Sequence, residues 1–261
     1  MVKDKQHVNQ SRQCGMVDWL GTSLVYAQKG KHFQPLRVEK LGKVDYQMTL
    51  AYQEKLVALR RKGQIPDTLL LLEHPPVFTI GRNGGRHNIL CSQEILIKEG
   101  IQIYEANRGG NVTYHGPGQL VGYPILDLSQ RDKDVHCYVR ELEKVLIQGL
   151  KDYLRPVGLT GHRISGYTGV WVGEEKIAAI GVGCKEWVTM HGFALNVNTN
   201  LRHFGLINPC GLGKPVTSLA KILKKEIDLG TVMDHIIPVF CEIFNFTAEE
   251  KISLHSVVKK F

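Results

Sequence analysis

The amino-acid sequence predicts an α/β or α+β fold, in which a mixed β-sheet is flanked by helices. Short apolar runs of strand length, such as the nearly continuous leucine run 68–72, recur through most of the chain. Two longer segments, 45–63 and 134–150, instead carry apolar residues at the spacing of a helix. Strands in meanders with helices between them are typical of a mixed sheet covered by helices. The sequence alone does not separate α/β from α+β.

Length and composition fit one large domain with an extension. The chain has 261 residues, of which 43% are hydrophobic and 22% are charged, as in ordinary globular proteins. Residues 1–35 are polar and irregular apart from an apolar patch at 19–26. We therefore interpret residues 1–35 as a partly disordered N-terminal extension and residues 36–261 as a single domain.

The first elements are a strand and a helix. A short strand over 36–41 leads to Asp45, a residue type that caps helix N-termini well. Gly63 follows a basic last turn, as helix ends prefer. The apolar residues that recur at helical spacing between these two ends, and predict a structural helix, are Met48, Tyr52, Leu56 and Leu59.

Four strands are expected next. The leucine run 68–72 predicts a buried strand, and 77–80 predicts another after a turn at 73–76 that contains two prolines. Residues 101–107 and 119–126 predict the strands on either side of a glycine-rich loop.

A helix and a hairpin follow. Asp134 caps a helix, and the strands 168–172 and 176–182 are joined through the short glycine-containing connection 173–175. The apolar residues that give the helix its period are Val135, Tyr138, Val139, Leu142, Val145, Leu146 and Leu150.

The last expected elements are one strand and two helices. The strand runs over 187–197, one helix lies within 216–226, and the other lies around 231–244. His191, inside that strand, fits a hydrogen-bonded structural histidine as well as a site residue.

The segment 108–119 has the composition of a binding loop. It packs four glycines and a proline together with arginine, tyrosine, histidine and glutamine. Glycines at this density allow a backbone to approach a ligand closely, and such mixed polar chemistry is typical of functional loops on a rigid scaffold. We therefore expect a ligand-binding loop here and no strand or helix.

Charge and cysteine content narrow the class of protein. The net charge of +8 favours acidic partners, which are nucleic acids or acidic proteins. Zinc-finger spacing, long basic tracts and RNA-binding aromatic motifs are missing from the sequence, which favours acidic proteins. The six cysteines form no CxxC pair and predict reduced thiols without a metal site. No run reaches membrane-spanning length and no signal-peptide core is found, so we expect a cytoplasmic enzyme.

One cysteine and one lysine could form a catalytic pair. Cys210 is the cysteine in a Pro/Gly turn, and Lys176 begins an otherwise apolar strand. A nearby ammonium group favours the nucleophilic thiolate, and a glycine-rich turn could supply amide donors to an acyl oxyanion. The pair therefore fits acyl transfer if the fold brings them together. An exposed turn cysteine and a solvated lysine at a strand end remain equally open.

These motifs together resemble the lipoyl(octanoyl) transferase family. The segment Arg108 to Gln119, with Tyr123-Pro124, is similar to that family's signature. Support comes, in the family's order, from Glu73-His74-Pro75-Pro76, Gly81-Arg82, Lys176 to Gly181, His191 to Asn196 and Pro209-Cys210-Gly211. The resemblance covers about residues 36–245 and leaves residues 1–35 unexplained.

The resemblance implies a fold, a reaction and a site. The fold is that of the catalytic domains of biotin protein ligases and lipoate–protein ligases. Cys210 would take an octanoyl group from octanoyl-acyl carrier protein as a thioester, with Lys176 lowering the thiol pKa. Substrate-binding residues would be Arg108, Gly109, Gly110, Asn111, Val112, Thr113, Tyr114, His115, Ala179, Ile180, Gly181, Gly192, Phe193 and Ala194.

The implied acceptors are lysines of the lipoyl domains of 2-oxoacid dehydrogenase E2 subunits and of the glycine cleavage H protein. Neither a cofactor nor a metal is implied, and neither nucleic acid nor membrane is a partner. An ATP-dependent lipoate–protein ligase or a lipoyl-domain amidotransferase on the same scaffold is the alternative. A non-catalytic binder of acyl carrier protein or RNA is the alternative from another class.

Overall fold

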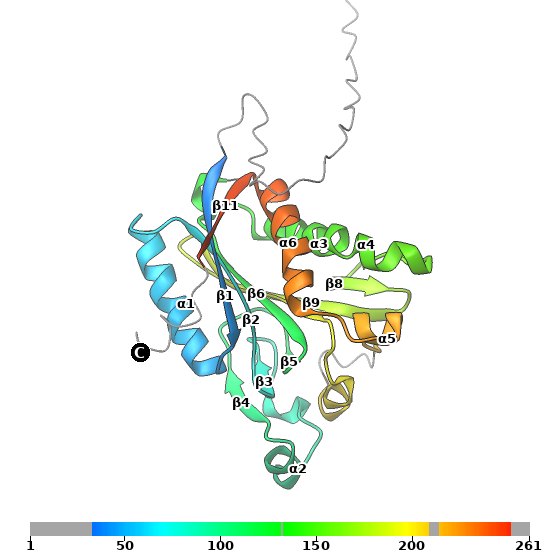
Figure 1. Cartoon of the computed structure of the whole chain (residues 1–261). Coiled ribbons are helices and arrows are strands. Elements are labelled where there is room, and N and C mark those ends of the chain that lie inside the picture. Colours follow the sequence, from blue (N-terminus) through cyan, green and yellow to red (C-terminus); the bar gives the residue numbers. More distant parts are fainter. Residues whose placement is uncertain (1–32, 132, 209–213, 252–261) are drawn as a thin grey trace, which may run out of the picture. The chain divides into compact units, whose positions relative to one another are not determined.

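The computed structural model describes residues 33–131, 133–208 and 214–251, which form two β-sheets and the helices around them (Figure 1). The elements, in chain order, are β1 (Gln34–Lys43), α1 (Tyr46–Arg61), β2 (Asp67–Glu73), β3 (Val77–Ile80), η1 (Arg86–Asn88), α2 (Gln93–Lys98), β4 (Gln102–Glu105), β5 (Val112–His115), β6 (Gln119–Ile125), η2 (Leu128–Gln130), α3 (Val135–Gly149), α4 (Lys151–Leu154), η3 (Arg155–Val157), β7 (His162–Ile164), β8 (Tyr167–Val172), β9 (Glu175–Lys185), β10 (Val188–Asn196), η4 (Leu201–Leu206), α5 (Leu219–Leu223), α6 (Leu229–Phe244) and β11 (Phe246–Lys251).

The large sheet is mixed, as the sequence predicts. Its eight strands lie in the order β11-β1-β2-β6-β10-β9-β8-β7. Strand β1 pairs in parallel with both β11 and β2, and the other neighbouring pairs are antiparallel. In the described part of the chain, no helix is long and apolar enough to cross a membrane.

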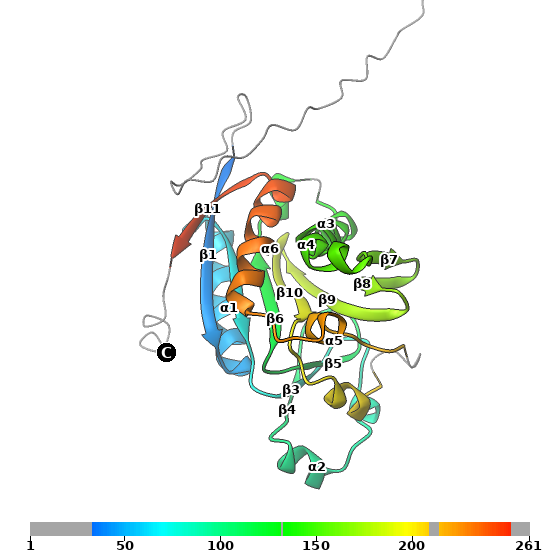
Figure 2. The ribbon, with the colours of Figure 1, turned by 45° about the vertical axis from the view of Figure 1, so that its right-hand side comes forward.

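Helices cover both faces of the large sheet, which explains the leucine run in β2. Leu69 and Leu71 pack into one core with α3 and α6, whereas Leu70 and Leu72 pack into a second core with α1. Successive side chains of a strand point to opposite faces, so a strand between two helical layers is apolar at every position. Figure 2 shows α6 and α3 on the near side of the sheet and α1 behind it.

The predicted helix α1 is confirmed, and Leu56 of its predicted apolar set is buried, but the set is wrong at Met48 and misses Gln53. The Asp45 carboxylate caps it by accepting from the N–H groups of Gln47 and Met48, as expected. Met48, however, is 37% exposed, while the polar residue Gln53 is fully buried. The Gln53 side-chain oxygen accepts a hydrogen bond from the N–H of His191 at 2.7 Å. Apolar spacing cannot reveal a polar residue that is buried because it is hydrogen-bonded.

The small sheet corrects the expectation of an all-loop segment at 108–119. It has the order β4-β3-β5, and β3 pairs in parallel with β4 and antiparallel with β5. Strand β5 lies inside the glycine-rich segment because Val112 and Tyr114 contribute to the core below this sheet. The loop is therefore limited to the residues on either side of 112–115.

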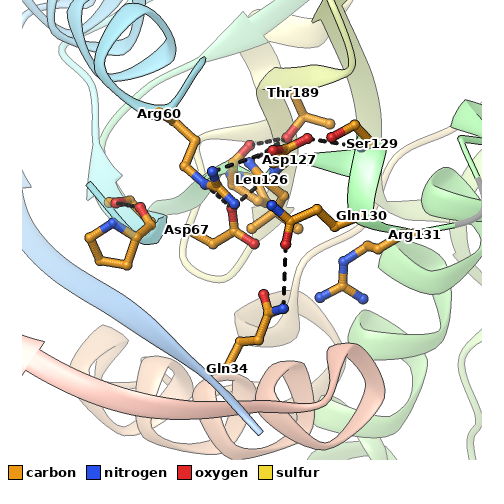
Figure 3. Close-up of polar contacts among 12 residues, drawn as sticks. Gln34, Arg60, Asp67, Leu126, Asp127, Ser129, Gln130, Arg131 and Thr189 are labelled. Carbon is orange, nitrogen blue, oxygen red and sulfur yellow. Dashed lines mark hydrogen bonds and ion pairs between the residues drawn. The ribbon is translucent and has the colours of Figure 1, made fainter. Parts of the chain in front are cut away.

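A buried ion-pair network joins the end of α1 to β2 and to the segment after β6 (Figure 3). Arg60 Nε donates to Asp67 Oδ1 at 2.6 Å, and Arg60 Nη1 lies 3.3 Å from Asp127 Oδ2. The N–H of Asp127 also donates to Asp67 Oδ1, at 2.9 Å. Burial raises the pKa of Asp67, while Arg60 and the Asp127 N–H oppose that rise. One guanidinium group therefore compensates two carboxylates at this end of the sheet.

Candidate active site

A cavity of about 330 Å³ lies between the small sheet and strands β9 and β10 of the large sheet. Its volume is at the lower end of the range of small-molecule sites, roughly 300–1,000 Å³. The lining residues are Tyr46, Arg108, Gly109, Gly110, Asn111, Val112, Thr113, His115, Tyr123, Gly166, Tyr167, Thr168, Trp171, Lys176, Ala179, Ile180, Gly181, His191, Gly192, Phe193, Ala194, Phe204, Lys214 and Val216.

The segments assigned to substrate binding from the sequence therefore line one cavity. Strands β9 and β10 bring two of them together, because Gly181 pairs with Gly192 and Ala179 pairs with Ala194. Small residues at these paired positions leave room between the sheets. Tyr114 is the exception. Its ring points into the core below the small sheet, against Phe78 and Phe204, and it does not line the cavity.

The Arg108–Gly110 segment lies directly on β9. The N–H of Gly109 donates to the carbonyl of Val182 at 2.9 Å. A Cβ added at Gly181 would lie only 3.1 Å from both Arg108 Cδ and the carbonyl oxygen of Gly109. A glycine at this position of β9 thus allows the loop to close over the strand and form a cavity wall.

Arg108 places a buried positive charge in that wall. Only 7% of this residue is exposed. Nη2 donates to the carbonyl and hydroxyl oxygens of Thr79 at 2.6 and 2.8 Å, and Nη1 donates to the carbonyl of Gly109 at 2.9 Å. Within the described residues, Nε has no hydrogen-bond partner. Burial lowers the pKa of the guanidinium group, but arginine stays charged at neutral pH, so it can orient a carbonyl dipole in the cavity.

Two histidines of the cavity are neutral. His115 Nδ1 donates to Gln119 Oε1 at 2.8 Å, and burial lowers the pKa of His115 well below its ordinary value. His191 Nε2 lies 2.5 Å from Asn107 Oδ1, and burial lowers its pKa to about 3. Neutral imidazoles at pH 7 position neighbouring groups and a ligand without adding charge.

Three tyrosines line the cavity but were not assigned to the site from the sequence: Tyr46, Tyr123 and Tyr167. Tyr46 begins α1, and its buried hydroxyl has no hydrogen-bond partner within the described residues. Burial raises its pKa to about 12. The hydroxyl of Tyr123 lies 2.8 Å from Nε2 of His74. Strand spacing and the Tyr-Pro pair could have indicated Tyr123, but the position directly after a helix cap carries no signal for Tyr46.

Lys176 lies at the edge of the cavity where β9 begins. Its Nζ donates to the carbonyl of Thr168 at 3.1 Å and lies 4.7 Å from the centre of the Trp171 ring. Its backbone pairs with the segment after residue 213, because its N–H donates to Pro215 O and its carbonyl accepts from Thr217 N–H, both at 2.9 Å.

Cys210 lies outside the described residues, but the residues on both sides of its segment are anchored. The N–H of Asn208 donates to the carbonyl of Asn88 at 2.7 Å. On the other side, Lys214 and Val216 line the cavity, and Val216 forms a bridge with Lys176. Among the side chains that the structure describes, no group of three His, Cys, Asp or Glu residues is arranged to hold a metal ion.

Comparison with known proteins identifies a family for this chain. Residues 45–241 match the lipoyl protein ligase A/B catalytic domain. An octanoyltransferase from Desulforamulus reducens is 51% identical over 215 residues, which cover 82% of this chain and 93% of the relative. An octanoyltransferase from Solibacter usitatus is 53% identical over 209 residues, which cover 80% and 93%.

Solved structures show the same fold at lower identity. A bipartite lipoate protein ligase from Thermoplasma acidophilum has a TM-score of 0.68 at 19% identity, covering 88% of this chain and 90% of that chain. A lipoate-protein ligase A bound with ATP has a TM-score of 0.66 at 19% identity, covering 86% and 92%. The match over most of the sequence establishes that the chain belongs to the lipoyl protein ligase A/B catalytic-domain family.

Proposed function

We propose that the protein is an octanoyltransferase that acts in lipoate biosynthesis. It takes an octanoyl group from octanoyl-acyl carrier protein and transfers it to a lysine of lipoyl domains, in 2-oxoacid dehydrogenase E2 subunits and the glycine cleavage H protein. Relatives of that name share about half of their residues with this chain over most of both lengths. The observation that carries the proposal is a cavity with small residues along β9 and β10 and a lysine at its edge.

The reaction uses Cys210 and Lys176 in two steps. In the first, the Cys210 thiolate attacks the carbonyl carbon of the octanoyl thioester, and the bond to the carrier thiol breaks. The leaving thiolate takes a proton from the Lys176 ammonium group. In the second, the acceptor amine attacks the new thioester, gives a proton to Lys176, and expels the Cys210 thiolate. A thioester and an amine thus become an amide and a thiol.

The other cavity residues bind and orient the acyl group. The glycines and alanines of β9 and β10 leave a narrow space for a straight alkyl chain. The buried positive charge of Arg108 polarises and orients the substrate groups that lie against the cavity wall. The described hydrogen bonds of Arg108 go to oxygens of Thr79 and Gly109, so no carboxylate neutralises its charge through them. His115, held by Gln119, stays neutral and acts as a positioning residue.

An ATP-dependent ligase is the rival because the same fold occurs in a lipoate-protein ligase A bound with ATP. A ligase activates a free acid, whereas the transferase starts from a thioester, and conversion of a thioester to an amide is downhill. The two activities therefore differ in their need for ATP.

Intact mass spectrometry separates the two functions. The full chain is mixed with octanoyl-acyl carrier protein in the absence of ATP, and its mass is followed. The transferase gains one octanoyl group, and Cys210→Ser does not gain a thioester-linked one. An absolute requirement for ATP, or equal labelling of Cys210→Ser, contradicts the proposal.

The role of Lys176 is tested in the same assay. Lys176→Ala should keep the fold, because the Lys176 side chain is only half-buried and lies at the edge of the cavity. The variant should be acylated more slowly by about 100-fold or more, as expected when a proton-transfer group is lost. Lys151→Ala, on the exposed face of α4, is the matched control and should react normally. Normal acylation of Lys176→Ala would refute its assigned role.

A further inference from the structure

We propose that Trp171 is a positioning residue for Lys176, and that its indole face holds the lysine ammonium at the edge of the cavity in its charged form. The catalytic role of this contact rests on the proposed function. The contact itself is a property of the fold. Nζ of Lys176 lies 4.7 Å from the ring centre of Trp171, within the roughly 6 Å at which an ammonium group is attracted to the face of tryptophan.

The sheet aims the two side chains at each other. Trp171 in β8 and Lys176 in β9 are direct cross-strand partners. The register of these strands shifts between Val170 and Trp171, and a bulge of this kind re-aims a side chain. The backbone register therefore places the two residues side by side, and the half-buried Lys176 side chain needs only to extend over the ring.

The indole ring is itself fixed. Trp171 is 1% exposed, and its Nε1 donates to the carbonyl of Tyr167 at 3.3 Å. The ring of Tyr167 packs edge-on against it, with the ring centres 6.0 Å apart. Burial, this hydrogen bond and the ring contact together hold the indole with one face toward the lysine.

Gly169 completes the cradle. Its φ of +125° lies outside the range of most L residues, and a Cβ built there would lie 2.5 Å from Ala178 O and 3.5 Å from Lys176 Cε. The neighbouring carbonyl of Thr168 accepts from Nζ at 3.1 Å. The lysine stem thus crosses β8 at a glycine, between a carbonyl acceptor and an aromatic face.

The two described carboxylates of the adjoining hairpin turn pair with other lysines. In the hairpin turn, Glu174 pairs with Lys214 at 3.7 Å, and Glu175 pairs with Lys221 of α5 at 2.6 Å. Lys214 Nζ also lies 5.8 Å from the ring centre of Tyr167, the titratable residue of β8 at this edge. Lys214 lines the same cavity as Lys176 and precedes Pro215, whose carbonyl accepts from the Lys176 N–H. A second positive charge near an ammonium group favours loss of a proton. The Trp171 face opposes that effect.

Stabilising the ammonium form has opposite consequences for the two reaction steps. The first step needs the cation, which favours the Cys210 thiolate and protonates the leaving thiolate. The second step needs the neutral amine as proton acceptor. Weakening the attraction of the ring should therefore slow acylation of the enzyme without slowing transfer to the acceptor.

Fluorinated tryptophans at position 171 test this inference without changing the shape of the buried ring greatly. One to four fluorine atoms progressively weaken the negative face of the indole that attracts a cation. Competitive labelling of Lys176 with acetic anhydride, read by mass spectrometry across pH, reports the midpoint of its deprotonation. The deprotonation midpoint of Lys176 should fall with each added fluorine atom. Trp171→Leu removes the aromatic face completely and should lower the midpoint by about 0.4 to 1.5 pH units. Trp171→Phe should retain part of the effect.

The same substitutions at Trp187, a 39% exposed residue in the turn between β9 and β10, are the matched control and should leave the midpoint unchanged. Single-turnover acylation should slow in step with the midpoint at position 171. The inference is overturned if the midpoint does not change, or if the midpoint shifts while the acylation rate stays the same. If the midpoint shifts but the protein is never acylated, the contact between Trp171 and Lys176 is supported and the proposed function is contradicted.

Discussion

At the level of single residues, burial lowers the pKa of three histidines at or near the cavity, His74, His115 and His191, and hydrogen bonds fix the orientation of each ring. His74 Nδ1 donates to the carbonyl of Val44 at 2.7 Å, so its Nε2 accepts from the hydroxyl of Tyr123 at 2.8 Å. Protonation of Nε2 would remove the acceptor of the Tyr123 hydroxyl proton. Burial lowers the pKa of His74 to about 4 and that of His191 to about 3. These side chains therefore link pH to stability.

We predict that stability falls between pH 7 and pH 5. An unfolded histidine titrates near pH 6.5, so below that pH the unfolded state binds more protons than the folded one, and stability decreases as pH falls. Each fully shifted histidine contributes roughly 2 kcal/mol over this interval. Urea unfolding at the two pH values measures the loss. His74→Gln should reduce it, and His136→Gln, which is exposed on α3, should not. Equal pH dependence in both variants would contradict the prediction.

Strand β10 approaches β6 closely at Gly192. A Cβ at this position would meet the carbonyl oxygen of Gly122 and Cδ of Pro124, which the paired strand cannot move away easily. Gly192→Ala should lower the free energy of unfolding by about 1–3 kcal/mol, as overpacking does. Gly205→Ala, where nothing lies within 4 Å of the added atom, is the control and should be near neutral. Denaturant unfolding distinguishes them, and equal midpoints for the two variants would argue against the close approach.

At the scale of the element, most helices and strands were predictable, and the exceptions have physical reasons. The leucine run of β2 and the apolar period of α3 carry strong signals because packing at those positions is apolar. The strand β5 was hidden by the glycines around it, and β7 has only three residues. The strand β11 pairs with β1, more than 200 residues away in the sequence, so local patterns do not reveal it.

The candidate site was predictable where loops carry unusual chemistry and hidden where ordinary elements contribute one side chain each. The Arg108–Gly110 segment drew attention through its glycines and its arginine. Tyr46 on α1, Trp171 on β8 and Phe204 on η4 each look like core residues in the sequence. Only the assembled sheets show that these three line the same cavity as the glycine-rich segment.

The ion pairs of α1 allow a prediction at this scale. Removing the Arg60 guanidinium leaves two carboxylates, Asp67 and Asp127, without their partner in a buried region (Figure 3). Arg60→Met should destabilise the fold by about 3–5 kcal/mol. The neighbouring Arg61 pairs with Glu186, a residue that is largely exposed, and Arg61→Met should cost less than about 1 kcal/mol. Chemical denaturation of both variants measures the difference, and similar losses would show that burial does not distinguish the two arginines.

In the molecule as a whole, the two sheets form opposite walls of the cavity. The large sheet buries both faces under helices and provides the rigid strands β9 and β10. The small sheet and the glycine-rich segment on it close the opposite wall of the cavity. Lys176 of β9 pairs through its backbone with Trp171 of β8 and with residues 215–217, so the group proposed for proton transfer is anchored on two sides.

The net charge of +8 supports a prediction about how carrier proteins reach this cavity. Acyl carrier proteins and lipoyl domains are typically acidic. A basic surface should therefore attract both and raise their association rates. Raising the salt concentration from low ionic strength should therefore lower kcat/KM for octanoyl-acyl carrier protein by about tenfold or more. Octanoyl-pantetheine, which lacks the acidic protein, is the matched donor and should show little salt dependence. Lys214→Glu, at the edge of the cavity, should weaken the salt effect more than Lys151→Glu on α4. A kcat/KM that is independent of salt, or equally dependent for both donors, would show that charge does not steer the carrier to this site.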